Sequence, residues 1–274
     1  NSSPVIALTE QERDKVIIDL LNRVKTGNYS MADSGVARWD RGWQENFDLL
    51  KSSNNTESLV PKYFRPNQPI RLNGNFVRAA DSNYELNWYN NYRDWFSQTY
   101  LNQYDNIYEF GSGSGHNVVY FANKYPNKTV YGFDWSQTGV DILEYLRTNL
   151  NLNVYGKQFD FFNPDWEYKI KPNSAVITIG ALEQTGTRWM AFIEWLIQQK
   201  PAIVVNIEPI VEWYLPKENL VDFTAVEIHM ARNFLRGYAP MINELSEKNV
   251  IDIIEQKRQY FGSLMLEGYS RLVW

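Results

Sequence analysis

The chain has 274 residues, of which 44% are hydrophobic, and this apolar content excludes an intrinsically disordered protein. Its 32 acidic residues outnumber its 27 basic residues, which argues against the broad phosphate-binding face of a DNA-binding protein. It has no cysteine and two histidines, so disulfides, thiolate nucleophiles and cysteine-ligated metals are excluded, and we expect no metal site.

The sequence shows no membrane-targeting signal. No window reaches the roughly 20 apolar residues of a membrane span. The first residues lack the basic segment and apolar block of a signal peptide. We therefore expect a cytoplasmic protein without a membrane partner, and the absence of cysteine fits a reducing compartment.

The N-terminal third is predicted to be mainly helical. Thr9 and Glu12 have the spacing of a capping box, and apolar residues then recur at helical period, so a helix is expected over about 9–25. A second, shorter helical pattern covers 38–51, and a third covers 84–101.

Aromatic residues are frequent in this part of the chain. They include Trp88, Tyr92 and Trp95 on one face of the third helix, and Tyr63 and Phe64 before it. Either they form a lid over a bound ligand, or they form the core between these helices and the rest of the protein. In the first case the arginines of the proline-rich segment, Arg65 and Arg71, could point at a substrate.

From residue 106 onwards, strands and helices alternate, which is typical of βαβ units around a parallel sheet. Helices are expected over about 116–125, 136–150 and 187–200. The predicted strands of this sheet cover 106–110, 128–134, 154–160, 174–181 and 202–208.

The C-terminal part is expected to carry a helical insert and then two strands. The insert lies within about 213–248, and the segments 250–261 and 269–274 are predicted to pair as an antiparallel edge hairpin. The fold class is therefore α/β, with a Rossmann-like, mostly parallel seven-stranded sheet and a helical N-terminal extension. We divide the chain into an extension, 1–103, and a core, 104–274.

A glycine-rich loop, "YEFGSGSG", follows the first strand of the core. Gly111, Gly113 and Gly115 allow a ligand to approach the backbone, at the strand ends where open parallel sheets bind ligands. A dinucleotide fingerprint needs its third glycine one place later, where this chain has His116. Glu109 would repel a diphosphate and attract an ammonium or sulfonium group. The loop thus favours a cationic nucleoside over NAD.

The segments "YEFGSGSG", "VYGFDWS" and "FDFFNPD" together resemble the class I S-adenosylmethionine-dependent methyltransferases. The resemblance covers about 106–208 and not the N-terminal third. It implies S-adenosylmethionine as the cofactor. It also implies that Glu109 and the loop residues Gly111, Ser112, Gly113 and Gly115 hold the methionine part.

The same resemblance implies the binding of the adenosyl part. Asp134 would accept both ribose hydroxyls, and Trp135 would pack against the adenine. Asp160 would receive the adenine amino group, with Phe161 beside it. Gly180, at the end of the fourth strand, would lie near the reactive methyl.

Each acid also has a purely structural interpretation. Asp134 is a neighbour of Ser136, which is the better cap for the next helix. Asp160 could cap a turn, and Glu109 could be a satisfied acid at a strand end.

The acceptor side is less defined by the sequence. "GALEQTG" after the fourth strand lacks the Asp/Asn-Pro-Pro-aromatic tetrad of the resembling DNA-base methyltransferases, which disfavours DNA as a partner. Glu183 is a candidate substrate-binding residue and Glu208 a candidate catalytic residue. The alternative for both acids is a loop hydrogen bond or a helix cap.

The insert is predicted to carry two stripes. The apolar stripe comprises Phe223, Val226, Met230 and Phe234, and the polar stripe comprises Asp222, His229, Arg232 and Arg236. If the polar stripe faces the cleft, His229 is a candidate general base, and Arg232 and Arg236 would clamp an anionic substrate. The alternative, more common for charged stripes, is a solvated face.

We therefore expect an S-adenosylmethionine-dependent methyltransferase whose partner is a small-molecule acceptor, with a hydroxyl of a sugar or natural-product intermediate preferred. The alternatives are a methyltransferase acting on protein or RNA, and a non-catalytic, cofactor-binding partner subunit.

Overall fold

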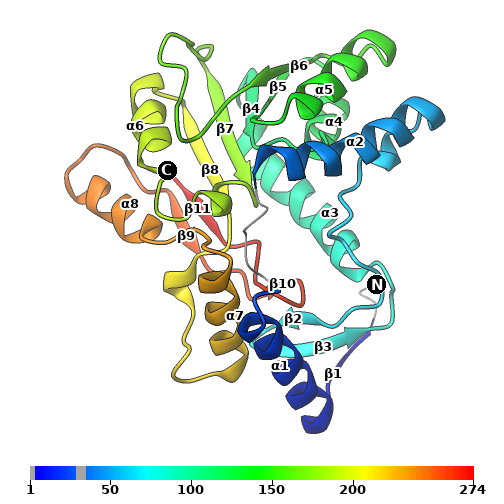
Figure 1. Cartoon of the computed structure of the whole chain (residues 1–274). Coiled ribbons are helices and arrows are strands. Elements are labelled where there is room, and N and C mark those ends of the chain that lie inside the picture. The colour runs from blue at the N-terminus through cyan, green and yellow to red at the C-terminus, as the bar shows by residue number, and fades with distance from the viewer. Residues whose placement is uncertain (1–3, 29–34) are drawn as a thin grey trace.

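The computed structural model describes residues 4–28 and 35–274 (Figure 1). Their central element is a seven-stranded sheet with the order β6-β5-β4-β7-β8-β11-β9. The neighbouring parallel strands are β4 (Asn106–Phe110), β5 (Thr129–Asp134), β6 (Val154–Gln158), β7 (Ser174–Ile179) and β8 (Ile203–Ile207). Two antiparallel strands, β11 (Arg271–Val273) and β9 (Glu255–Lys257), complete the edge. The expected seven-stranded sheet with its edge hairpin is confirmed.

The strand order creates a switch point between β4 and β7. The chain passes from β4 outwards to β5 and β6, and then crosses back to β7 on the other side of β4. Loops that follow neighbouring strands diverge at such a point, so the carboxyl ends of β4 and β7 are the place where this fold binds ligands.

Helices cover both faces of this sheet. Ile107 and Tyr108 are consecutive on β4, yet they belong to apolar clusters on opposite faces, as the two-residue period of a strand requires. One face is covered by α3 (Tyr84–Phe96), α4 (His116–Lys124) and α5 (Gln137–Asn149). The other is covered by α6 (Met190–Gln199) and α8 (Tyr238–Glu247). The central strands are thus buried on both sides, which explains their apolar sequences.

The N-terminal segment contains the expected helices. In α1 (Glu10–Lys25) the capping box of Thr9 and Glu12 is present, and α2 (Val36–Ser53) lies against α5. A π-helical turn, Ser97–Leu101, extends α3. Short 3-10 turns also occur at Thr56–Leu59, Leu182–Thr185 and Val211–Trp213.

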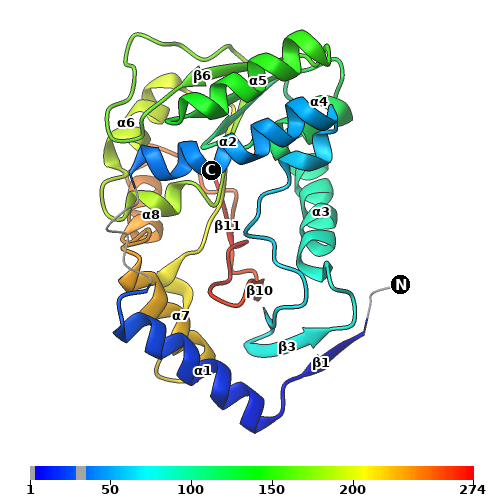
Figure 2. The ribbon, with the colours of Figure 1, turned by 45° about the vertical axis from the view of Figure 1, so that its right-hand side comes forward.

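This segment also contains strands, which join it to the C-terminal part of the chain. They are β1 (Val5–Ala7), β2 (Ile70–Leu72) and β3 (Asn75–Ala79), and β10 (Phe261–Gly262) pairs with β2 to complete a small antiparallel sheet. Figure 2 shows this sheet near α1 and α7 (Leu220–Ala231), away from β5 and β6. The division at residue 103 remains a prediction.

Two members of each stripe of the insert lie opposite to the usual arrangement, although Phe234 of the apolar stripe is buried. Phe223 and Met230 are 37% and 47% exposed, whereas Asp222 and His229 are buried. The polar side chains are buried because they have partners inside. Asp222 pairs with Arg258, and His229 Nε2 lies 2.6 Å from the carbonyl oxygen of Leu235. The solvated-face interpretation is therefore wrong for these two residues.

A buried ion-pair network joins the insert to the edge hairpin. Arg258 lies 2.6 Å from Asp222 and 2.7 Å from Glu267, and all three side chains are less than a tenth exposed. Arg258 also donates to the carbonyl oxygen of Trp213.

None of the helices within 4–28 and 35–274 is long and apolar enough to cross a bilayer.

Replacing Arg258 by methionine is expected to destabilise the protein by about 3–5 kcal/mol, because two carboxylates would stay buried without a cation. Urea unfolding measures this change. Arg147→Met is the control, since Arg147 forms an exposed ion pair with Glu144, and its unfolding midpoint is expected to stay nearly unchanged. Equal midpoints for the two variants would contradict the role assigned to the network.

Candidate active site

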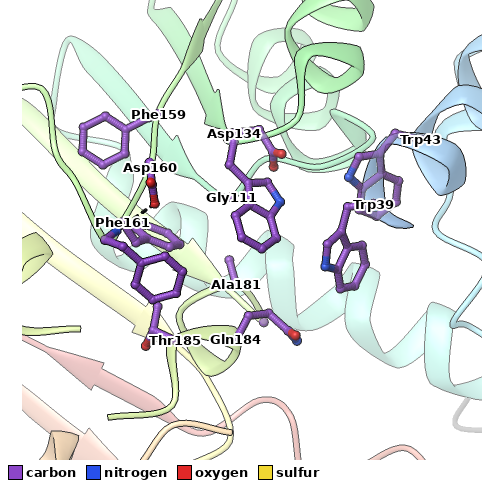
Figure 3. A pocket seen from close by; sticks show the side chains of 13 residues that line it. Trp39, Trp43, Gly111, Asp134, Phe159, Asp160, Phe161, Ala181, Gln184 and Thr185 are labelled. Atoms are coloured by element: carbon purple, nitrogen blue, oxygen red, sulfur yellow. Dashed lines mark hydrogen bonds between the residues drawn. The ribbon is translucent and has the colours of Figure 1, made fainter. Parts of the chain in front are cut away.

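Two adjoining cavities lie at the switch point of the sheet. The first has a volume of about 80 Å³ and lies beyond the ends of β4, β5 and β7 (Figure 3). Its lining includes six of the residues predicted from the sequence to bind the cofactor: Gly111, Asp134, Trp135, Asp160, Phe161 and Gly180. The structure thus brings these residues together from four separate strand ends.

The glycine loop is bare because neighbouring segments press against it. A Cβ atom on Gly111 would lie 2.2 Å from the Cβ of Ala181, and one on Gly113 would lie 2.8 Å from the ring of Trp43. Gly111, Gly113 and Gly115 also have φ values of 77°, 53° and 77°, which favour glycine. The loop is therefore shaped by packing as well as by any ligand.

Asp134 connects the second strand to this loop. Its Oδ2 accepts a hydrogen bond from the backbone N–H of Gly113 at 2.8 Å, and its Oδ1 accepts one from Ser136 at 2.9 Å. The helix cap is Ser136, whose Oγ accepts from the N–H of Gly139. Burial raises the pKa of Asp134 to about 6. Each oxygen retains acceptor capacity for a ligand hydroxyl.

Glu109 lies behind the loop and is buried. Its Oε1 accepts a hydrogen bond from Asn117 Nδ2 at 2.8 Å, while its Oε2 has no partner among the described residues. Burial raises its pKa to about 8, although the cation of Arg93 lowers it in part. The alternative interpretation of Glu109, an acid at a strand end with all its hydrogen bonds made, therefore applies to only one of its two oxygens. A cationic ligand is the kind of group that would pair with the other oxygen.

The other predicted residues of the loop take different positions. Ser112 is buried, and its Oγ has no partner in the part of the chain that the structure describes. Ser112, Gly113 and Gly115 lie outside the lining of the first cavity. Burial lowers the pKa of His116 to about 3, which keeps its ring neutral at the start of α4, where the helix dipole disfavours a positive charge.

The far end of the first cavity is aromatic. Asp160 is exposed and accepts a hydrogen bond from the N–H of Phe162 at 2.8 Å, so it does cap a turn, while its side chain also borders the cavity. Phe161 packs against Phe192 with ring centroids 4.5 Å apart. Trp135 is partly buried and lines the same space.

Two tryptophans of α2, which were not among the residues predicted from the sequence, form another wall. Trp39 and Trp43 stack with their centroids 5.5 Å apart, and both line the first cavity (Figure 3). Asp40 anchors this helix to the core, because it accepts hydrogen bonds from Ser136 Oγ and from the N–H of Thr138. The spacing of four residues between Trp39 and Trp43 places both rings on one face of the helix, and it is the sequence signal by which this wall could have been predicted.

The second cavity has a volume of about 220 Å³ and shares Trp39, Gly180 and Gln184 with the first. Gly180 has a φ of 58°, and a Cβ atom there would meet nothing within 4 Å, so the backbone is open where the two cavities meet. Aromatic, acidic and basic side chains line the rest. They include Tyr63, Phe64, Tyr89, Phe234, Tyr269, Glu85, Glu183, Arg23, Arg65 and Arg232.

The two acids of the second cavity have raised pKa values. Burial raises the pKa of Glu183 to about 8, the charge of Glu208 raises it further, and Arg232 opposes the shift. Glu183 accepts a hydrogen bond from Gln184 at 2.7 Å. Burial likewise raises the pKa of Glu85 to about 7, against the hydrogen bond that Tyr269 donates to it at 3.1 Å.

Glu208, our candidate catalytic residue, holds a loop of the backbone. It is fully buried and accepts three backbone hydrogen bonds, from the N–H groups of Ala181, Leu182 and Glu183, at 3.0 to 3.2 Å. It lies outside the lining of both cavities. The alternative interpretation, a loop hydrogen bond, is the one that this geometry supports.

The predicted residues of the insert are separated by the structure. Arg232 lines the second cavity, whereas His229 and Arg236 line neither. Burial lowers the pKa of His229 to about 4, and its Nε2 is already engaged by the carbonyl oxygen of Leu235. Arg236 interacts with Asn233 on its own loop. We therefore assign no proton transfer to His229.

The aromatic residues of the N-terminal segment are divided between a cavity wall and the core, and the lid remains a prediction. Tyr63 and Phe64 line the second cavity, with Arg65 beside them. Trp88 and Tyr92 are stacked core residues, with centroids 4.9 Å apart.

The other arginine of the proline-rich segment, Arg71, is fully buried away from both cavities. It donates to Thr224 Oγ1 at 3.0 Å. Arg71 therefore links β2 to α7 and does not point at a substrate.

No protein-family model matches the chain, and no curated protein matches it. Among solved structures, an O-methyltransferase family protein from Burkholderia thailandensis is similar with a TM-score of 0.50 and 12% identity, over 69% of this chain and 56% of its own. N,N-8-amino-8-demethyl-D-riboflavin dimethyltransferase from Streptomyces davawensis gives a TM-score of 0.46 and 14% identity, over 69% and 55%.

PKMT2 from Rickettsia typhi in complex with AdoHcy gives a TM-score of 0.35 and 19% identity, over 39% of this chain and 22% of its own. The aligned region spans less than two thirds of each of these proteins. The likeness shows the fold, and the expected class I methyltransferase fold is confirmed.

The close approach of Gly111 to Ala181 can be tested by substitution. Gly111→Ala is expected to destabilise the protein by about 1–3 kcal/mol, because the new methyl group overpacks the junction of β4 and β7. Gly27→Ala is the matched control, since that glycine also has a positive φ, of 73°, and nothing lies within 4 Å of an added Cβ atom there. Denaturant unfolding compares them, and a Gly111 variant as stable as the parent would show that the junction is not tight.

Proposed function

We propose that the protein transfers a methyl group from S-adenosylmethionine to a hydroxyl of a small-molecule acceptor. The observation that carries the proposal is the junction at Gly180, where a cavity lined by the predicted cofactor residues adjoins a second cavity that is lined by Glu183. The description of the Burkholderia protein as an O-methyltransferase family member supports oxygen as the acceptor atom.

The residues around the first cavity fit this cofactor. The unpartnered oxygen of Glu109, which lies outside the lining of both cavities, suits an ammonium group. Gly111 brings its backbone to the lining of the first cavity. The two oxygens of Asp134 suit a ribose diol. Trp135 and Phe161 suit an adenine, and Asp160 suits its amino group.

When bound, S-adenosylmethionine supplies a methyl group that its sulfonium has already activated. The work of the chain is therefore to position the acceptor, to exclude water and to take up a proton. Trp39, which lines both cavities, and the ring of Tyr63 form part of the wall that excludes water. Glu183 is three residues beyond Gly180 and lies in the second cavity, where its carboxylate can accept the proton of the acceptor hydroxyl.

Glu208 supports this arrangement without touching either cavity. Its carboxylate holds the three N–H groups that begin the loop of Glu183. It therefore acts as a positioning residue, and its negative charge helps to keep the pKa of Glu183 high.

Cofactor binding is tested by calorimetric titration with S-adenosylhomocysteine. The parent protein is expected to bind it, and Asp134→Asn is expected to lose tenfold or more in affinity, because an amide replaces a carboxylate that accepts ligand hydroxyls. Asp141→Asn, on the outer face of α5, is expected to bind as the parent does. Absence of binding to the parent at millimolar concentration would rule out the proposed cofactor.

Methyl-donor consumption across a panel of hydroxylated metabolites tests the role of Glu183. With a pKa of about 8, Glu183 is mostly protonated at neutral pH, so activity is expected to rise as the pH increases through 8. Glu183→Gln is expected to lower turnover by roughly 10²- to 10⁴-fold and to abolish this rise, with unchanged binding of S-adenosylhomocysteine.

The control is Glu194→Gln, on the exposed side of α6, which is expected to keep the turnover and the pH profile of the parent. If Glu183→Gln also keeps both, another group removes the proton, or the acceptor needs no base.

A further inference from the structure

We infer that the acceptor is an oxyanion, bearing a phosphate, sulfonate or carboxylate group, and that Arg23 and Arg65 bind its charged end at the second cavity. The inference rests on the proposed function only in treating the second cavity as the acceptor cavity. Neither arginine has a role in the proposed methyl-transfer chemistry.

Three arginines from separate parts of the chain line this one cavity. Arg23 comes from the last turn of α1, Arg65 from the proline-rich segment before β2, and Arg232 from the end of α7. In the small sheet region, α1 packs against α7, which brings two of these elements together. Guanidinium groups present several donors in a plane, and this geometry suits carboxylate and phosphate oxygens.

Arg23 and Arg65 differ from three other exposed arginines of the protein. Arg13, Arg78 and Arg147 each form an ion pair with a nearby acid. Within the described residues the side chains of Arg23 and Arg65 have no acidic partner, although both border a cavity that contains acids. An arginine that is open to solvent and faces a cavity is available to an incoming anion.

The acids of the cavity do not cancel these charges. Glu85 is buried on α3 and hydrogen-bonded to Tyr269, and burial holds its pKa near 7. Burial raises the pKa of Glu183 to about 8, so this carboxyl group is mostly protonated and uncharged at neutral pH. At neutral pH the cavity therefore carries a net positive charge, although the whole chain has a formal net charge of −5. A local positive field of this kind attracts anionic ligands and is weakened by salt.

The aromatic wall of the second cavity favours an acceptor with an apolar part. Tyr63, Phe64 and Tyr89 form contiguous ring contacts, with centroid distances of 4.8 Å between the first two and 5.5 Å between the last two. Such a wall favours a flat or ring-shaped body between the arginines and Gly180. The acceptor is thus expected to combine a ring with an anionic substituent.

The test compares two fluorescent probes of nearly the same shape, the anionic 8-anilinonaphthalene-1-sulfonate and the neutral N-phenyl-1-naphthylamine. Each is titrated into the full chain with and without saturating S-adenosylhomocysteine. The sulfonate is expected to bind at least tenfold more tightly than the neutral probe. The double variant Arg23→Gln/Arg65→Gln is expected to weaken sulfonate binding by roughly tenfold or more, since hydrogen bonds to charged groups are lost.

The matched control is Arg13→Gln/Lys62→Gln, which removes two positive charges from α1 and from the proline-rich segment at positions that form exposed ion pairs. It is expected to bind the sulfonate as the parent does. Equal sulfonate binding by the two double variants, or equal loss of both probes, would overturn the inference. Failure of S-adenosylhomocysteine to bind would instead overturn the proposed function. The two failures can be told apart, because the probes are also compared without S-adenosylhomocysteine.

Discussion

The site depends on the close approach of two strand ends, those of β4 and β7. Gly111 and Ala181 meet there so tightly that a Cβ atom on the glycine would lie 2.2 Å from that of the alanine. This contact brings the glycine loop against Gly180, and the two cavities adjoin at that residue. The diverging loops at the switch point of the parallel sheet leave room for the cavities. Gly111, which has no side chain, allows the ends of β4 and β7 to approach closely beside them.

The N-terminal segment completes the site rather than standing apart from it. Trp39 and Trp43 of α2 wall the first cavity, whereas Tyr63, Arg65 and Glu85 wall the second. The segment is held to the core by the pairing of β2 with β10 and by the hydrogen bonds of Asp40. The acceptor cavity is thus shared between parts of the chain that lie far apart in sequence, so its shape depends on how these parts dock.

Buried carboxyl groups are the main electrostatic feature of this region. Glu109, Asp134, Glu183 and Glu208 have pKa values raised by burial, and they differ in how far hydrogen bonds compensate. Glu208 has three backbone donors and is structural, whereas one oxygen of Glu109 has no partner within the described residues. Sequence alone does not separate these cases, because it shows the acids without their donors.

The sequence by itself determined the parallel sheet, its edge hairpin and the helices, because apolar periodicity is a local consequence of which faces are buried. It also identified the loop of Gly111 and the acids Asp134 and Asp160, since strand ends in such a sheet converge. Only the tertiary structure decided the roles of Asp222 and His229, which are buried against Arg258 from the edge hairpin and the carbonyl oxygen of Leu235 just after α7. The tertiary structure alone also placed Trp39 and Arg23 at the cavities, because the spacing of residues along a helix does not show where that helix docks.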